Sequence, residues 1–212
     1  MPRCQSAMVS KYLRLLTRRL LNPALGFGLL TTILSHGLYA AELKRIEIKG
    51  VYEHPLSKIS FPERVGQFNR GGIIQFDSIG ANVGVGYSLV ALGAEVLITA
   101  YVYPVEAPQA SPSVVLENQF VAEKAAIMRS HGIERLLSEA DVSLSWNVEP
   151  KGKLASFSFE EAFLKRTQPV RSELYLFIVK KYFLKYRITY PEKQSEEVKP
   201  HIEQFLDEVR SP

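Results

Sequence analysis

The chain has 212 residues, of which 46% are hydrophobic and 23% are charged, and its formal net charge is +4. Segment 1–40 contributes five basic residues and no acidic one, so the remainder has 21 basic and 22 acidic residues and a formal charge of −1. Because residues 41–212 are nearly neutral, we do not expect them to bind nucleic acid, which requires clustered Lys and Arg. About 170 residues are enough to bury a core without disulfides.

The N-terminal segment has the order of a secretory signal peptide. Basic residues between Lys11 and Arg19 precede an apolar stretch at 24–34, and small residues lead up to Ala40 before the acidic Glu42. This order predicts a signal peptide at 1–40 and a single periplasmic or secreted domain at 41–212. Residues 17–21 also resemble a twin-arginine export signal, although ordinary secretion is favoured.

Retention of the segment as an anchor is an alternative. The polar or helix-breaking residues Asn22, Pro23 and His36 leave 20–41 short of the roughly 20 apolar residues that a spanning helix needs. Leu38 is nevertheless a poor residue for the −3 position of a cleavage site. The single cysteine, Cys4, lies in the basic part, so the exported chain would have no disulfide, thiolate nucleophile or cysteine metal site.

Alternating apolar and polar residues predict strands in the first half of the exported chain. The expected strands cover residues 44–50, 71–76, 82–89 and 95–105, whereas 52–68 is expected to be irregular. A turn is expected at 77–80. Val83, Val85 and Tyr87 should share one side of their strand.

A long helix is expected from Pro112 to about His131. Ser111 is a good N-cap, Pro112 suits the first helical position, and Gly132 suits the C′ position. Its apolar residues should lie across a sheet, and they are Val114, Leu116, Phe120, Val121, Ala125, Ile127 and Met128.

Four further strands and a closing helix are expected in the second half. Residues 142–148 and 155–159 alternate around a hairpin turn at 149–153, and residues 174–179 and 182–190 flank a turn at Lys180–Lys181. The basic run Lys180, Lys181, Lys185 and Arg187 is interpreted as the solvated side of this hairpin. The final helix begins at Ser195 or Pro200, and its apolar residues at helical spacing are Ile202, Phe205, Leu206 and Val209.

Strands therefore mostly follow strands, with two helices to cover them. This order predicts an α+β fold, in which a long central helix and a C-terminal helix pack on a twisted antiparallel sheet.

The order of motifs resembles a known fold family. Residues 61–68, 83–87 and 99–104 precede the long helix, and residues 171–176 and 183–190 end the sheet. This order of strand motifs and aromatic residues resembles that of uncharacterised bacterial exported proteins related to the PsbP-like fold. The same fold also includes periplasmic lipoproteins of the DcrB type. The resemblance implies a twisted antiparallel sheet between helices and a role in binding or assisting. It supplies no catalytic residue, and the chain lacks the lipobox of the lipoprotein members.

No motif for catalysis, a metal or a cofactor is found. Residues 83–86 lack the third glycine of a dinucleotide loop and continue a strand. The histidines His54, His131 and His201 lie far apart, without metal-ligand spacing, and His131 suits the C-terminal end of the long helix. Neither Glu160–Glu161 nor Glu196–Glu197 forms an acid–base pair, because strand neighbours point to opposite faces. We therefore expect no catalytic residue, no cofactor and no metal.

Tyrosines give the best candidate surface for a ligand or partner. Tyr101 and Tyr103 should share one strand face, and Tyr186 and Tyr190 one face of another strand, with Arg187 opposite. Tyrosine combines a flat apolar ring with a hydroxyl, which suits a binding groove. Cover over the sheet edge or under a helix is the competing interpretation.

Three functions stay open. The leading hypothesis is an exported, non-enzymatic protein that binds an envelope protein or a small ligand. The second is an exported hydrolase whose site is assembled from distant residues, because a Ser–His–acid site converges only in space. The third is an assembly factor tethered to the membrane by residues 20–41.

Overall fold

The structure is a computed structural model that describes residues 43–91, 94–106, 109–131, 136–144 and 147–209. The predicted signal peptide and the alternative anchor lie outside these residues. No helix in the described part of the chain is long and apolar enough to cross a membrane.

The described residues form strands, two α-helices and one short 3-10 helix. In chain order they are β1 (Lys44–Ile46), β2 (Tyr52–Glu53), β3 (Ser60–Phe61), β4 (Arg64–Val65), β5 (Phe68–Gln75), β6 (Val83–Ala91), β7 (Ala94–Pro104), α2 (Pro112–His131), β8 (Leu136–Leu144), β9 (Asn147–Phe163), β10 (Arg166–Val179), β11 (Tyr182–Pro191), η1 (Glu192–Gln194) and α3 (Ser195–Glu208).

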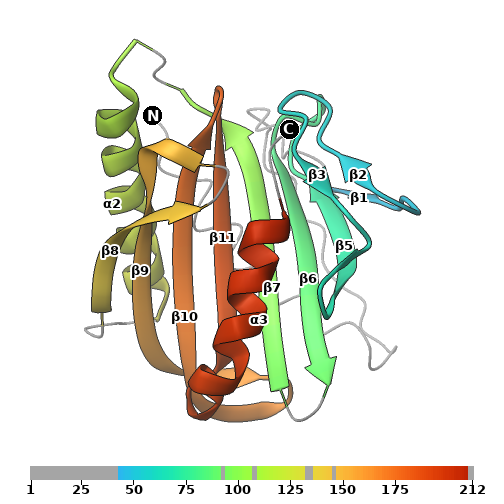
Figure 1. Cartoon of the computed structure of the whole chain (residues 1–212), viewed down its shortest axis with the longest axis vertical. Coiled ribbons are helices and arrows are strands. Elements are labelled where there is room, and N and C mark those ends of the chain that lie inside the picture. The colour runs from blue at the N-terminus through green and yellow to red at the C-terminus, as the bar shows by residue number, and fades with distance from the viewer. Residues whose placement is uncertain (1–42, 92–93, 107–108, 132–135, 145–146, 210–212) are drawn as a thin grey trace, which may run out of the picture.

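One large antiparallel sheet organises the fold. Its strand order is β1-β5-β6-β7-β11-β10-β9-β8, and β4 pairs with β5, while β2 and β3 form a separate small sheet. β7 pairs with β11, which joins the two halves of the chain in the middle of the sheet. The twisted sheet and its two helices are visible in Figure 1. The predicted α+β fold class is confirmed.

The alternation in β7 shows how the sequence builds two cores. Val96, Ile98 and Val102 belong to the apolar cluster that includes the buried side of α3. Leu97 and Tyr103 pack instead against the cluster that includes α2. Successive side chains of a strand point to opposite faces, so each helix covers a different face of the sheet.

Helix α3 covers its face of the sheet with an amphipathic stripe, as predicted. Its buried residues include Ile202, Phe205 and Leu206. The ring of Phe205 lies edge-on to Phe68 and Tyr87, with centroids 5.1 and 5.0 Å away. A fully buried side chain of this size contributes about 1.5–3 kcal/mol. Tertiary burial thus stabilises the C-terminal helix despite Pro200 within it.

The predicted orientation of the long helix is partly wrong. α2 begins at Pro112 as expected and buries Leu116, Phe120 and Ile127. Val114 and Val121 are 52% and 51% exposed, however. The helix turns Glu123 toward the sheet, where it pairs with Lys185. This orientation leaves Val114 and Val121 on the exposed side of the helix.

The predicted hairpin turn at 149–153 is also wrong. β9 already begins at Asn147, so these residues lie within a strand, and the connection from β8 falls at 145–146, outside the described residues. The pairing changes from Val142 with Gly152 to Leu144 with Asn147, which leaves a bulge in β9. Prolines within strands are tolerated at such bulges. The turn at Lys180–Lys181 is confirmed, and Lys180 has a φ of 58° there.

Candidate functional site

The five residues predicted to form a ligand or partner surface lie on two faces of the sheet. Tyr101, Tyr103 and Arg187 are on the α2 side, whereas Tyr186 and Tyr190 belong to the core under α3. Tyr186 is fully buried and Tyr190 is 4% exposed. The structure therefore separates the five side chains into two groups on opposite faces of the sheet. Their role in binding stays a prediction, and Tyr186 has no surface to offer.

The tyrosines under α3 join a polar group at the edge of the core. The hydroxyls of Tyr190 and Tyr175 donate to Glu173 at 2.8 and 3.1 Å. Burial, together with the nearby Glu173 carboxylate, raises the pKa of both tyrosines. These hydroxyls therefore act as neutral hydrogen-bond donors, and the bond from Tyr190 to Glu173 joins β11 to β10.

A buried ion pair lies on the α2 side. The Lys185 ammonium is 3.0 Å from the Glu123 carboxylate and 4.5 Å from the centre of the Tyr101 ring. Glu123 also accepts hydrogen bonds from Tyr103 at 3.1 Å and from Gln119 at 3.0 Å. Burial raises the pKa of Glu123, but the Lys185 charge and the hydrogen bonds from Lys185, Tyr103 and Gln119 together outweigh burial and hold that pKa below its ordinary value.

Arg187 lies beside this pair and points inward. Its Nη2 donates to Ser172 Oγ at 2.8 Å, while Nε has no partner among the described residues. Burial lowers the pKa of Arg187 and raises that of Tyr101 to about 12. The predicted solvated basic run is therefore wrong for Lys185 and Arg187, because β11 turns both toward α2. This group is built to join α2 to the sheet.

A serine and a histidine meet in the loop between β2 and β3. Ser57 Oγ lies 2.9 Å from Nδ1 of His54, and the Ser57 backbone N–H donates to the same nitrogen at 3.0 Å. Nδ1 is thus an acceptor, which places the ring proton on Nε2. The two residues are 1% and 0% exposed, so no substrate reaches the hydroxyl in this conformation.

The surroundings of His54 favour its neutral form. Burial lowers the pKa of the ring, and this effect exceeds the opposing influence of the Ala81 and Gly80 carbonyls and the Asp77 charge. Tyr182 packs edge-on against the ring with centroids 5.5 Å apart. The arrangement is that of a histidine that holds a turn in place.

Stability should therefore fall in mild acid. The unfolded chain binds a proton at His54 near pH 6.5, whereas the folded chain binds it only at lower pH, so stability is lost as pH falls below about 6.5. We expect His54→Gln to lose less stability than the wild type between pH 7 and pH 5, measured by urea unfolding. His201→Gln serves as the control and should keep the wild-type pH dependence. Equal slopes for His54→Gln and the wild type would contradict this assignment.

The other sequence candidates have structural explanations. Gly84 allows close aromatic packing, as predicted, because a Cβ there would lie 3.0 Å from the Phe76 ring. The ring of His131 stacks on Phe159 with centroids 4.1 Å apart. Within the described ranges, no three His, Cys, Asp or Glu side chains are grouped so that they could hold a metal ion.

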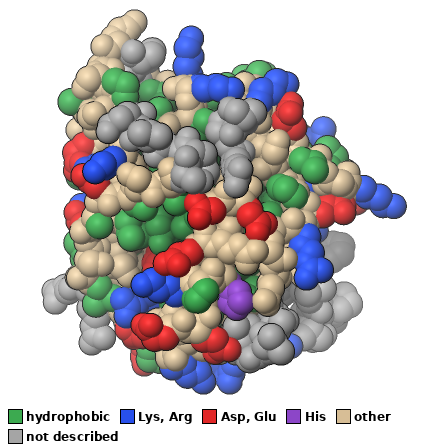
Figure 2. Space-filling view, in the orientation of Figure 1, with side chains coloured by type: hydrophobic (Ala, Val, Ile, Leu, Met, Phe, Trp, Pro, Cys, Tyr) green, Lys and Arg blue, Asp and Glu red, His purple; other side chains and the backbone are tan. Residues whose placement is uncertain are grey.

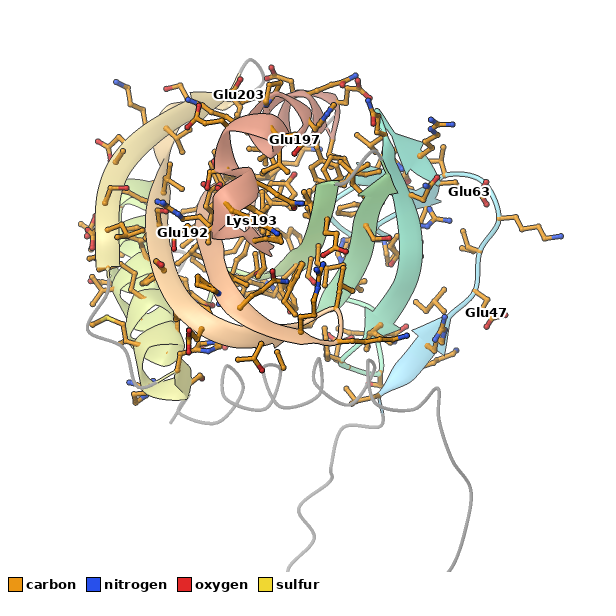
Figure 3. The ribbon with its side chains drawn as sticks, turned by 90° about the horizontal axis from the view of Figure 1, so that it is seen from below. Glu47, Glu63, Glu192, Lys193, Glu197 and Glu203 are labelled. Carbon is orange, nitrogen blue, oxygen red and sulfur yellow. The ribbon has the colours of Figure 1, made fainter. Side chains whose placement is uncertain are left out.

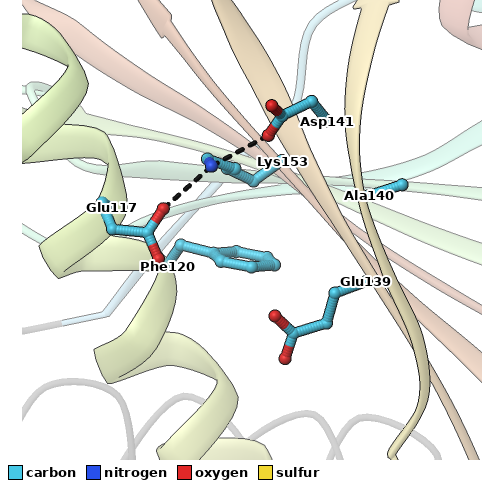
Figure 4. A pocket seen from close by; sticks show the side chains of 6 residues that line it. All are labelled: Glu117, Phe120, Glu139, Ala140, Asp141 and Lys153. Carbon is cyan, nitrogen blue, oxygen red and sulfur yellow. Dashed lines mark ion pairs between the residues drawn. The ribbon is translucent and has the colours of Figure 1, made fainter.

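The accessible candidate site is a cleft between α2 and β8, shown in Figure 4. It has a volume of about 270 Å³, and its lining residues are Glu117, Phe120, Glu139, Ala140, Asp141 and Lys153. Lys153 Nζ bridges Glu117 and Asp141, at 2.8 Å from each. The hydrogen bond from Lys153 and its charge lower the pKa of Asp141, so this carboxylate is ionised at neutral pH.

Sequence reasoning missed this cleft. Its charged groups come from α2, β8 and β9, and no local spacing connects them. Lys153 was expected in a turn, and the strand that supplies Glu139 was expected to begin only at residue 142. The alternation of acidic and apolar residues at 139–142 would have been the available signal.

No protein-family model and no curated protein matches the chain. Among solved structures, it is similar to the solution structure of cyanobacterial PsbP (CyanoP) from Synechocystis sp. PCC 6803, with 8% sequence identity and a TM-score of 0.37. The match covers 84% of this chain and 95% of that one. No residue role is transferred from it.

Proposed function

We propose that the chain is an exported, non-enzymatic protein that binds a partner or ligand in the cell envelope. The observation that carries the proposal is the contrast between its buried and its accessible polar groups. Ser57 with His54, and Glu123 with Lys185, are enclosed and hydrogen-bonded to each other. The carboxylates of the α2–β8 cleft are accessible and held by lysines.

This contrast favours binding because catalysis needs a reactive group within reach of the substrate. Lys153 holds two carboxylates in one geometry, and Phe120 supplies an apolar surface beside them. Such a combination suits recognition of a molecule that carries both positive charge and apolar groups. The signal-like segment at 1–40 supports the envelope as the location.

A hydrolase is the second candidate, because one observation favours it. Ser57 and His54 have the hydroxyl–imidazole distance of a nucleophile and its base. This function would require the loop between β2 and β3 to open and expose both side chains.

An activity assay separates the two functions. The purified chain is tested against panels of esters, phosphoesters and peptides, beside Ser57→Ala as the matched variant. We expect that the wild type shows no turnover, or no more turnover than Ser57→Ala. Turnover by the wild type that disappears in Ser57→Ala would overturn the non-enzymatic proposal in favour of the hydrolase.

A further inference from the structure

The outer strand β8 is the feature that the proposed function leaves unexplained. β8 pairs with β9 on one side and ends the strand order of the sheet, so within the described residues its other side has no partner strand. Residues 136–141 are all exposed. The opposite end of the sheet is formed by β1, which has three residues. Exposed edge strands present unpaired N–H and C=O groups that can bind another strand.

The two faces of β8 differ in chemistry. Glu139 and Asp141 point to the α2 side, where Lys124 and Lys153 pair with them. On the other face, Val142 and Leu144 are partly buried and pack against the α3-side core, as does Leu154 of the neighbouring strand. Figure 2 shows apolar side chains gathered on this face of the molecule with acidic side chains around them.

The α2 side of β8 carries paired charges. The three carboxylates Glu117, Glu139 and Asp141 face two ammonium groups, Lys124 and Lys153, which leaves a net charge of −1 among these five groups. Glu197 and Glu203, labelled in Figure 3, lie on α3, which packs against β7 in the middle of the sheet. A positively charged partner is therefore favoured on the α2 side of β8.

We propose that β8 binds an extended partner segment in which basic and apolar residues alternate, as an added strand. The regular part of the edge runs from Ser138 to Val142, because these residues pair with β9 in an unbroken register. In an added strand, basic side chains would lie beside Glu139 and Asp141, and apolar side chains beside Val142. This proposal rests on the proposed binding function and names the chemistry of the partner.

A second copy of the chain is a poorer occupant. An antiparallel pair of β8 strands centred on Ala140 would place Glu139 of one copy opposite Asp141 of the other. Like charges directly opposite each other destabilise a strand pair. The same carboxylates that disfavour self-pairing are complementary to lysine or arginine in a different strand.

The test uses synthetic peptides and the full chain. The probe is a labelled nine-residue peptide of alternating Lys and Val, and the matched control has the same composition with all lysines at one end. Fluorescence anisotropy should show roughly tenfold tighter binding of the alternating peptide. The variant Glu139→Gln/Asp141→Asn should weaken that binding several-fold, whereas Glu196→Gln/Glu197→Gln on α3, with the same loss of charge, should not.

Hydrogen exchange identifies the binding mode. The alternating peptide should protect amides of residues 138–142 that exchange rapidly in the free chain. Equal binding of both peptides, or no new protection in β8, would overturn strand addition. Protection that rises with protein concentration in the absence of peptide would assign the edge to a second copy and also overturn the proposal. Turnover abolished by Ser57→Ala would instead refute the proposed function and leave the exchange result unaffected.

Discussion

Lys185→Met should lower the free energy of unfolding by about 3 kcal/mol at neutral pH, because it leaves the buried Glu123 carboxylate without its cation. The hydrogen bonds that Tyr103 and Gln119 donate to this carboxylate compensate for only part of the lost interaction with Lys185. Urea unfolding at pH 7 measures the effect. As a control, Lys58→Met removes an exposed pair with Glu53 and should cost less than about 1 kcal/mol.

The pH dependence and a double variant test the cause of this loss. In the wild type, Glu123 has a pKa below its ordinary value of 4.5, so its contribution is present above pH 4.5 and is lost as pH falls through the folded pKa. Without Lys185, burial raises the Glu123 pKa, and the deficit of Lys185→Met should shrink in acid. Glu123→Leu/Lys185→Met should recover most of the stability. A double variant as unstable as Lys185→Met would show that the ion pair is not the cause.

Gly152→Ala should destabilise the chain by about 1–3 kcal/mol, because the core has no room for the added methyl group. A Cβ at Gly152 would lie 2.2 Å from the ring of Phe177, which is itself fully buried. Thermal and urea unfolding measure the change. Gly71→Ala is the matched control, since the nearest heavy atom to its Cβ would be 4.0 Å away.

A second-site change identifies the contact responsible. In a Phe177→Leu background, the further loss caused by Gly152→Ala should be smaller than in the wild type, because the ring that blocks the methyl group is gone. Additive losses would mean that the strain of Gly152→Ala does not arise at Phe177.

Local sequence patterns predicted most of the fold. Strand alternation at Val96 to Val102 assigned the two faces of β7, and Pro112 marked the start of α2. These features depend on neighbouring residues alone. The turn predicted at 149–153 was wrong because proline and glycine are also tolerated at a bulge, and the pairing of Gly152 with Val142 of the distant strand β8 places these residues in β9.

The candidate site was far less predictable. Lys185 was predicted to belong to a solvated basic run, and no role was predicted for Glu123, although the fold brings the two within 3.0 Å of each other. Lys153 and Asp141 likewise meet only through the pairing of β8 with β9. Charge pairs between distant elements leave no periodic signal in the chain, which is why the tyrosines were favoured over the cleft.

The central claim is that the chain acts by binding at β8, and site-specific photocrosslinking in cells tests it most directly. A photoreactive residue replaces Leu137 on β8 in one variant and Ile79, near the opposite end of the sheet, in the other; both positions are exposed, at 47% and 71%. We predict one reproducible crosslinked product at position 137 that the alternating Lys–Val peptide suppresses, and none at position 79. Equal products at both positions, or a product at 137 that the peptide does not affect, would contradict the claim.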